Sequence, residues 1–210
     1  LRYATPTYQA FAKMLIKDND GNGGNRRGMM NMADFGMVSN SSGFDHELEI
    51  LQSHNLAIQT VRDIKLYVSY RTNGRIRDQL LYKNQPISAD IDSASLDNLN
   101  APIQMEVTRK GSQYHVKGSY QIPISEDEAG AMNTIDKKFT SLPAVIDTRA
   151  GKITLTVNGN RSLRNDETEF ITITPPKQAA YRFRGRMSVQ PNSKTTSIAR
   201  LQIIDESPER

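Results

Sequence analysis

The chain has 210 residues, enough for one large domain or two small ones with a sizeable hydrophobic core. It contains no cysteine, which excludes disulfides and thiol chemistry and leaves open both a cytosolic location and an exported bacterial domain. Its 27 basic residues exceed its 23 acidic residues by only 4. This small positive surplus is compatible with binding to an acidic polymer, a membrane headgroup or a nucleic acid, and it does not favour one of these partners over the others.

The sequence carries no membrane-spanning segment of its own. No stretch of 18 residues is apolar and free of charge. The first residues also lack the basic start and apolar centre of a signal peptide. Because the chain begins with Leu1 rather than methionine, we expect it to be a piece of a longer protein.

The N-terminal segment predicts a strand followed by a loop. Two sets of side chains alternate over residues 8–16, which is the period of a strand, and we expect one face of this strand to be fully buried. Residues 18–28 contain turn-forming residues and no apolar side chain, which indicates a loop.

Two short amphipathic helices are predicted next. Each carries an apolar stripe with helical spacing: Phe44, Leu48 and Leu51 in the first, and Ala57, Val61 and Ile64 in the second. Ser42 and Ser53 are placed to cap the two N-termini. Helices this short need a packing partner, so we expect the pair to lie across a sheet.

From residue 66 onward, alternating patterns replace the helical period. Residues 66–70 predict a strand, and Asn73-Gly74 predicts a tight turn. Short strands separated by polar turns then fill residues 75–175. The clearest of them are a hairpin and two strands, over residues 103–116, 153–157 and 170–173. We therefore predict a β-rich insert over residues 75–175.

The C-terminal segment predicts a helix and two strands. Pro175-Pro176 can begin the helix, because proline is tolerated in a first helical turn. The strands are predicted from Met187 to Pro191 and over residues 196–204, and we expect the last strand to be a neighbour of the first in one sheet.

These patterns predict a discontinuous core of residues 1–74 and 176–210, interrupted by the insert of residues 75–175. The predicted fold class is α+β, in which a small mixed or antiparallel sheet packs against helices.

Three short motifs are similar to functional signatures, and each lacks residues that the chemistry needs. Asp34-Phe35-Gly36 matches the magnesium-binding tripeptide of protein kinases, without the other kinase motifs. Residues 18–29 begin like a calcium loop, but Met29 stands where a bidentate glutamate is required. His46-Glu47 begins a zinc-protease motif that lacks its second histidine. We therefore predict no catalytic, cofactor-binding or metal-binding residue, and no enzyme, in this segment.

Four charged residues are candidates for a contact between protomers. Glu47 and Glu49 lie on the first predicted helix, and Arg75 and Arg77 follow the Asn73-Gly74 turn. Exposed ion pairs contribute only roughly 0–1 kcal/mol each, so such pairs would fix how two protomers align more than they would raise the affinity of the contact.

Several sequence blocks, in the same order, resemble a known family. Near the start and the end stand PTYQAFAKMLIKD and SVQPNSKTTSIARLQIIDESPER, and between them DHELEILQSHNLAIQTVRDIKLYVSY and GRIRDQLLYKNQPI. These blocks resemble the extracytoplasmic region of Wzz/Wzc-type polysaccharide chain-length determinants. The similarity is greatest to Bacteroidetes exopolysaccharide proteins that carry a bacterial tyrosine-kinase domain. It covers both ends of the chain well and the insert only loosely.

The resemblance implies a Wzz-like periplasmic domain of a bacterial inner-membrane protein, held by one membrane span on each side. It implies a homo-oligomeric ring that works with the polymerase and export machinery to control the chain length and export of capsular or other exopolysaccharide. ATP and Mg²⁺ would bind in a cytoplasmic protein-tyrosine kinase domain outside this segment, so no cofactor and no nucleic acid are expected here.

Two other functions remain open. The β-rich insert could be a carbohydrate-binding module, because tyrosine rings can stack on sugars. The chain offers seven candidate rings, which the sequence alone does not bring together: Tyr8, Tyr67, Tyr70, Tyr82, Tyr114, Tyr120 and Tyr181. A glycoside hydrolase would instead need two carboxylates about 5–10 Å apart in a cleft.

Overall fold

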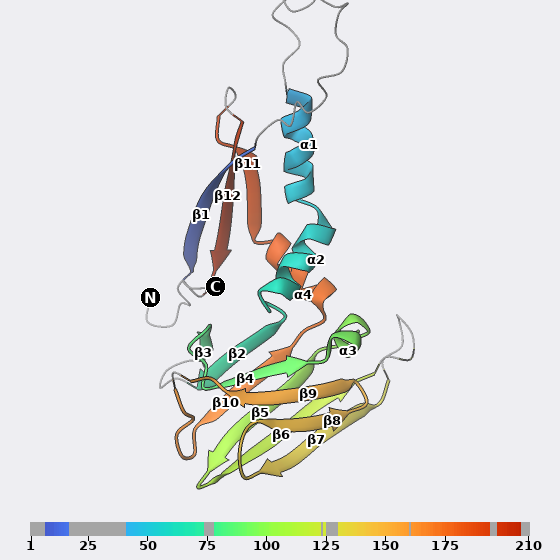
Figure 1. Ribbon diagram of the computed structural model, residues 1–210, viewed down its shortest axis with the longest axis vertical. Helices are drawn as coiled ribbons and strands as arrows, with labels where there is room; N and C mark the ends of the chain where they lie inside the picture. Colours follow the sequence, from blue (N-terminus) through green and yellow to red (C-terminus); the bar gives the residue numbers. More distant parts are fainter. Residues whose placement is uncertain are drawn as a thin grey trace, which may run out of the picture.

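The computed structural model describes residues 7–16, 41–73, 78–122, 124, 130–159, 161–193 and 197–206. These residues form two bodies, one above the other in Figure 1, with a pair of helices between them. The upper body contains a small sheet and one helix. The lower body contains two layers of strands, one of six strands and one of three.

The upper body is built on a three-stranded antiparallel sheet, called sheet A here, in the order β1-β12-β11. Its strands are β1 (Tyr8–Leu15), β12 (Ile198–Asp205) and β11 (Met187–Pro191). In the first pair, Tyr8 lies opposite Asp205 and Leu15 lies opposite Ile198. The prediction that the first and last strands are neighbours is therefore confirmed.

Helix α1 (Ser41–Leu51) packs on one face of sheet A. Its buried residue Leu48 shares a small apolar cluster with Val189 of β11, Ala199 of β12 and Ile16, which follows β1. Phe44 and Leu51, the other predicted stripe residues, pack against the same cluster. The predicted apolar stripe of the first helix is thus confirmed.

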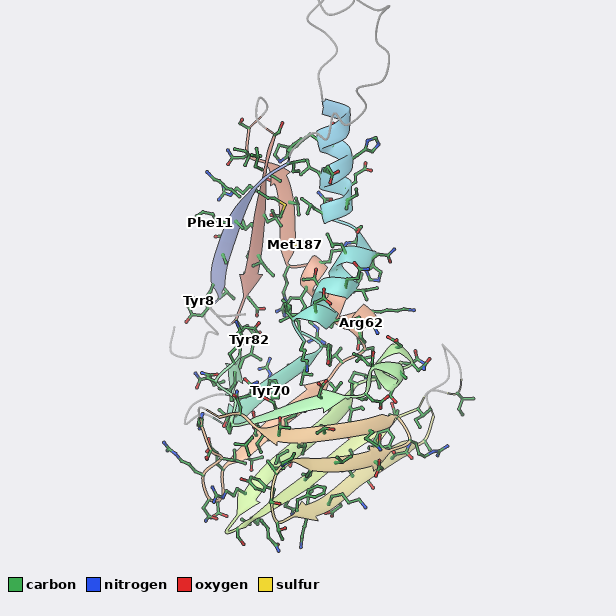
Figure 2. All side chains as sticks on the ribbon, in the orientation of Figure 1. Tyr8, Phe11, Arg62, Tyr70, Tyr82 and Met187 are labelled. Carbon is green, nitrogen blue, oxygen red and sulfur yellow. The ribbon has the colours of Figure 1, made fainter. Side chains whose placement is uncertain are left out.

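The prediction of a fully buried face on β1 is wrong. All eight of its residues are exposed, and Phe11 and Leu15 keep 65% and 63% of their surface. Strand β1 is the edge of sheet A, and α1 contacts β11 at the opposite edge. Figure 2 labels Tyr8 and Phe11 on β1, the edge strand that lies farthest from α1. The alternating pattern identified the strand, but it did not show which layer covers it.

Helices α2 (His54–Asp63) and α4 (Pro176–Arg184) pack on each other between the two bodies. The Ser53 hydroxyl caps α2 and accepts a hydrogen bond from the Leu56 backbone N–H at 3.2 Å, as predicted. Ile64, predicted within the apolar stripe, instead ends the helix and is 51% exposed. The expectation that both helices lie across one sheet is wrong, because α1 covers sheet A whereas α2 packs on α4.

The lower body consists of two antiparallel sheets packed face to face. Sheet B has the order β3-β2-β10-β5-β6-β7, and sheet C has the order β4-β9-β8. The strands of sheet B are β2 (Val68–Asn73), β3 (Asp78–Leu81), β5 (Ile103–Lys110), β6 (Gln113–Gln121), β7 (Met132–Phe139) and β10 (Thr168–Ile173). Those of sheet C are β4 (Ile87–Ile91), β8 (Ala144–Thr148) and β9 (Gly151–Val157), and helix α3 (Ser93–Asp97) follows β4.

One hydrophobic core joins the two sheets and the helix pair. Ile103 and Ile171 of sheet B and Leu155 of sheet C are fully buried in it, and so is Ala180 of α4. Val61 of α2 belongs to the same cluster and is also buried. Sheets B and C, which together form the sandwich, therefore share a core with the helix pair. Helix α1 and sheet A have the separate small cluster around Leu48.

The predicted α+β class, with a Wzz-like core of helices packed on a small sheet, is wrong. Strands hold 49% of the described residues and helices 20%, and all three sheets are antiparallel. Several strands were not predicted from the sequence because apolar and polar residues do not alternate regularly in them. In β7, for example, only Ile135 is buried, so its sequence carries no regular apolar pattern.

The hairpin predicted over residues 103–116 is confirmed as the β5–β6 pair. The domain boundary predicted at residue 74 crosses sheet B, because β2 pairs with both β3 and β10. A strand of the predicted core segment thus lies in the same sheet as strands of the predicted insert. The division into residues 1–74, 75–175 and 176–210 stays a prediction.

Candidate functional site

The first candidate surface is the outer side of α1. The predicted interface residues Glu47 and Glu49 are exposed on this helix, together with Asp45 and Ile50. None of the three carboxylates has an ion pair within the part of the chain that the structure describes. This acidic surface, called the α1 outer face, therefore carries uncompensated negative charge.

The second candidate surface is the face of sheet A that α1 does not cover, called the open face. Along β1 it presents Phe11, Lys13 and Leu15, and along β12 it presents Arg200 and Ile204. Lys13 lies directly opposite Arg200 in the ladder, and the Arg200 guanidinium lies 5.3 Å from the centre of the Phe11 ring. Like charges placed opposite each other destabilise a sheet. The open face thus combines exposed apolar side chains with two positive charges that have no ion pair among the described residues.

These two surfaces point in opposite directions. The residues of α1 that touch sheet A meet the face that holds Val189 and Ala199, and the open face lies on the other side of the same strands. The acidic and basic surfaces cannot meet within one copy of the chain. The other two predicted interface residues, Arg75 and Arg77, lie outside the described residues, so their pairing with Glu47 and Glu49 stays a prediction.

The third candidate is a cleft of about 550 Å³ beside sheet C, which we call the Tyr82 cleft. Such a volume lies within the range of small-ligand sites. The cleft is bordered by the turn after α2, by β2, by the segment after β3, and by β4 and β9. The residues that line it are Ile64, Lys65, Val68, Tyr70, Tyr82, Lys83, Gln85, Ser88, Ala89, Asp90, Ile91, Asp92, Lys152, Thr154 and Thr156.

Sheet C supplies a polar floor to the Tyr82 cleft. Ser88 pairs with Thr156, and Asp90 pairs with Thr154, across β4 and β9. The alternate residues of these strands, such as Ile87 and Leu155, point into the buried core. The alternation of the two strands therefore places hydroxyl and carboxylate groups together on the side that faces the cleft.

Two lysines at the edge of the cleft have unusual backbones. Lys65 has φ +54° and Lys83 has φ +62°, in the left-handed region that Gly and Asn adopt more readily. The Lys83 ammonium lies 5.3 Å from the centre of the Tyr82 ring. The Asn158 side chain donates to the Lys83 carbonyl at 3.0 Å, which fixes this segment beside the end of β9. Strained non-glycine residues of this kind are frequent at ligand sites.

The carboxylates of the cleft have partners within the protein. Asp90 forms an ion pair with Lys65 and accepts a hydrogen bond from the Tyr67 hydroxyl at 2.9 Å. Asp92 accepts hydrogen bonds from the backbone N–H groups of Lys152 and Ser95, both at 2.9 Å, and these bonds hold its pKa below the usual range. The Lys152 ammonium is 3.8 Å from Asp147 in an exposed pair, which stabilises little. The groups that remain free to meet a ligand are therefore mainly cationic or hydroxylic.

Two of the seven candidate tyrosines share this cleft. Tyr82 is half-buried beside it, and Tyr70 is buried at its inner wall. The Tyr70 hydroxyl accepts a hydrogen bond from the Ala89 N–H at 3.0 Å, and burial raises its pKa to about 12. Figure 2 labels both side chains, which come from the β2 and β3 region of sheet B. Tyr70 therefore positions β4, and Tyr82 is the ring that a ligand can reach.

A buried carboxyl group lies between the two sheets. Glu169 of β10 is fully buried and accepts one hydrogen bond, from the Ile87 N–H of β4 at 3.0 Å. Its other oxygen has no partner within the described residues. Burial raises the pKa of Glu169 to about 8, against the opposing effects of the Ile87 hydrogen bond and of Arg161. This glutamate links sheet B to sheet C through the Ile87 hydrogen bond, and its raised pKa favours the neutral carboxyl.

The motifs rejected in the sequence gain no support. Asp34-Phe35-Gly36 and the calcium-like residues 18–29 lie outside the described residues. Within the described part of the chain, no group of three or more His, Asp or Glu side chains is arranged to hold a metal ion. In the same part, no helix is both long and apolar enough to cross a membrane.

The Tyr82 cleft escaped sequence reasoning because its residues come from four separate segments. One local signal was present: Ile87, Ala89 and Ile91 alternate with Ser88 and Asp90, which marks β4 and its polar side. No sequence signal identified Lys65 or Lys83, since lysine is an unusual residue at a left-handed position.

The described chain is a two-body, antiparallel β protein in which the Tyr82 cleft lies in the lower body and two oppositely charged surfaces lie in the upper body. No protein-family model matches this chain, and no curated protein matches it.

Proposed function

We propose that this chain is a non-catalytic periplasmic scaffold of a polysaccharide co-polymerase, whose copies associate to control the chain length and export of capsular or other exopolysaccharide. The parent protein would be an inner-membrane tyrosine kinase with its ATP site elsewhere. The observation that carries the proposal is the pair of uncompensated, opposite charges on the α1 outer face and the open face of sheet A. Because they point in opposite directions, they favour contact between copies.

The contact would be heterologous, with the α1 outer face of one copy on the open face of the next. A contact of this kind repeats from copy to copy and closes into a ring or continues as a filament. Ile50 would meet the apolar area around Phe11 and Leu15, and Glu47 and Glu49 would meet Lys13 and Arg200. Burying exposed apolar side chains supplies affinity, and the charges set the register.

The proposal gains support from the segments that carry the family resemblance. The block near the start of the chain contains β1, the longest middle block contains most of α1 and all of α2, and the last block contains most of β11 and all of β12. Of these elements, β1, α1, β11 and β12 are far apart in sequence and meet in the upper body. Three of the four blocks thus contribute elements to the upper body, where the two charged surfaces lie, and the fourth contributes β3 to the lower body.

Light scattering tests this function on the 210-residue chain and on the parent protein with its proposed membrane spans. We expect concentration-dependent association of the chain and a defined oligomer of the parent protein. A parent protein that stays monomeric at all concentrations would contradict the scaffold function.

A second candidate function is carbohydrate binding, and the Tyr82 cleft favours it. The cleft joins an accessible aromatic ring to a row of hydroxyl groups from Ser88, Thr154 and Thr156. Titration with the exopolysaccharide of the source bacterium separates the two functions. A scaffold need not show saturable affinity for the polymer, whereas a carbohydrate-binding module must.

A further inference from the structure

We propose that the Tyr82 cleft binds an acidic glycan, one that carries carboxylate groups on its sugar rings, and that Lys83 is the main contact to the carboxylate. This inference rests on the second candidate function, carbohydrate binding, and is independent of the association between copies. The inference specifies the chemical class of the ligand, and it names the residues that would distinguish an acidic glycan from a neutral one.

The balance of charge in the cleft carries the choice of ligand class. Three lysines and two aspartates line it. Asp90 pairs with Lys65 and accepts a hydrogen bond from Tyr67, and Lys152 lies 3.8 Å from Asp147. Asp92 stays charged, and its oxygens accept hydrogen bonds from backbone N–H groups. Lys83 has no ion pair within the described residues, and its only described interaction through the ammonium is with the Tyr82 ring. The cleft therefore presents a cation without a counter-ion next to an aromatic ring.

A uronic-acid ring fits this arrangement group by group. Its apolar C–H face can lie on Tyr82, whose side chain is partly exposed and lines the cleft. Its hydroxyls can exchange hydrogen bonds with Ser88, Thr154 and Thr156 along the polar floor. Its carboxylate can pair with Lys83, and Lys152, which lines the cleft from β9, is available to a second acidic residue of the glycan. Charge-assisted hydrogen bonds of this kind are stronger than neutral ones.

The backbone at Lys83 supports a role in binding rather than in folding. A left-handed lysine is less stable than a left-handed asparagine, and the Lys83 side chain has no ion pair among the described residues, only the cation–π contact with the Tyr82 ring. The Asn158 hydrogen bond uses the Lys83 carbonyl and not its side chain. Replacing the side chain should therefore leave the segment in place.

The experiment measures binding to the 210-residue chain by isothermal titration calorimetry. The acidic probes are oligogalacturonate, oligomannuronate and a glucuronate-containing oligosaccharide, and the neutral probe is a malto-oligosaccharide of equal length. Inorganic phosphate and vesicles of anionic lipid test whether any anion suffices. We expect saturable binding of at least one acidic oligosaccharide, and binding of the neutral one to be at least about tenfold weaker, because a charge-assisted hydrogen bond is worth about 1.5–3 kcal/mol.

The decisive variant is Lys83→Asn, because asparagine tolerates the left-handed backbone and the fold should persist. We expect it to weaken binding of the acidic oligosaccharide about tenfold or more. The matched control Lys137→Asn removes the same charge from exposed β7, outside the cleft, and should change affinity less than about twofold. Tyr82→Ala should weaken binding of the same probe roughly fivefold.

Three results would overturn the inference. One is the absence of saturable binding by all three acidic oligosaccharides. Another is equal affinity for the neutral oligosaccharide, or binding only of phosphate or anionic vesicles. The third is an equal loss of affinity in Lys83→Asn and Lys137→Asn. Association between copies is measured separately by light scattering. A negative result for glycan binding therefore does not contradict the scaffold function, and a negative result for association does not contradict glycan binding.

Discussion

The two bodies of this protein bury their strands to very different degrees. In the sandwich, sheets B and C cover each other, and residues such as Ile103, Leu155 and Ile171 have no exposed surface. In the upper body, one short helix covers part of one face of sheet A, and every residue of β1 is exposed. The two sheets of the sandwich bury each other's apolar faces. Sheet A keeps one edge strand and one face exposed, where another molecule can bind.

The same contrast holds for charge. The sandwich compensates its aspartates with neighbours, as in the Lys65–Asp90 pair and the backbone donors to Asp92. On sheet A, Lys13 and Arg200 lie opposite each other without an acidic partner among the described residues. Uncompensated charges beside exposed apolar side chains are typical of a surface that functions in contact with a partner.

The largest expected effect tests the sandwich core. Leu155→Ala removes a fully buried side chain between sheets B and C and should lower the free energy of unfolding by about 3 kcal/mol. The control Val157→Ala, two residues further along β9 at a position that is 46% exposed, should cost less than about 1 kcal/mol. Urea denaturation followed by circular dichroism measures both. Equal losses would show that the sandwich is not the main source of stability.

A second prediction concerns Glu169, which links the two sheets of the sandwich. The unfolded carboxyl titrates near its ordinary value of 4.5, and burial raises the folded pKa to about 8. Between these values the folded state binds one more proton than the unfolded state, so the stability falls as the pH rises through this window, by at most about 1.4 kcal/mol per pH unit. Glu169→Gln, which stays neutral, should remove this dependence.

Denaturation curves at several values between pH 5 and pH 8 measure this effect for wild type and variant. The charged neighbours Arg161 and Glu167 and the phenol of Tyr70 are present in both proteins, so the difference between them reports Glu169 alone. Parallel pH profiles would show that the carboxyl is already charged in the folded state.

The third prediction tests the helix pair between the two bodies. Ser53→Ala removes the N-cap of α2 and should cost about 1 kcal/mol, whereas Ser53→Asp keeps a capping oxygen and should stay close to wild type. Thermal unfolding of the three proteins makes the comparison. A similar loss in both variants would mean that the Ser53 hydroxyl has another role.

The smallest expected effect on stability comes from sheet A. Phe11→Ala removes an aromatic ring that is 65% exposed on the open face, so it should change the free energy of unfolding by less than about 1 kcal/mol. The same variant should clearly weaken association in light scattering, because the ring is available for contact between copies. A large loss of stability would show that the open face is covered within the single chain.

The sequence predicted individual elements better than their arrangement. The stripe of Phe44, Leu48 and Leu51 identified α1, and alternation identified β5, β9 and β12, because each of these segments has one side against a core. Alternation in β1 also identified a strand, but an exposed strand can alternate as regularly as a buried one. The edge strand β7, with one buried residue, carried no usable pattern.

The candidate sites show the same limit. Glu47 and Glu49 could be chosen from the sequence because charged residues on an amphipathic helix face outward. Their proposed partners Lys13 and Arg200 are 187 positions apart in the chain and become neighbours only through the β1–β12 pairing. The Tyr82 cleft depends in the same way on the approach of β2, β4 and β9, which no local pattern encodes.

The most direct test of the account is an exchange of charge between the two surfaces of the upper body. One variant carries Glu47→Lys and Glu49→Lys on α1, and the other carries Lys13→Glu and Arg200→Glu on the open face. In a heterologous contact each variant repels its own copies, but a mixture restores opposite charges at every contact. We predict that light scattering finds each variant monomeric alone and association restored in an equimolar mixture. Association of either variant alone at the wild-type level, or a mixture that stays monomeric, would contradict the proposed contact.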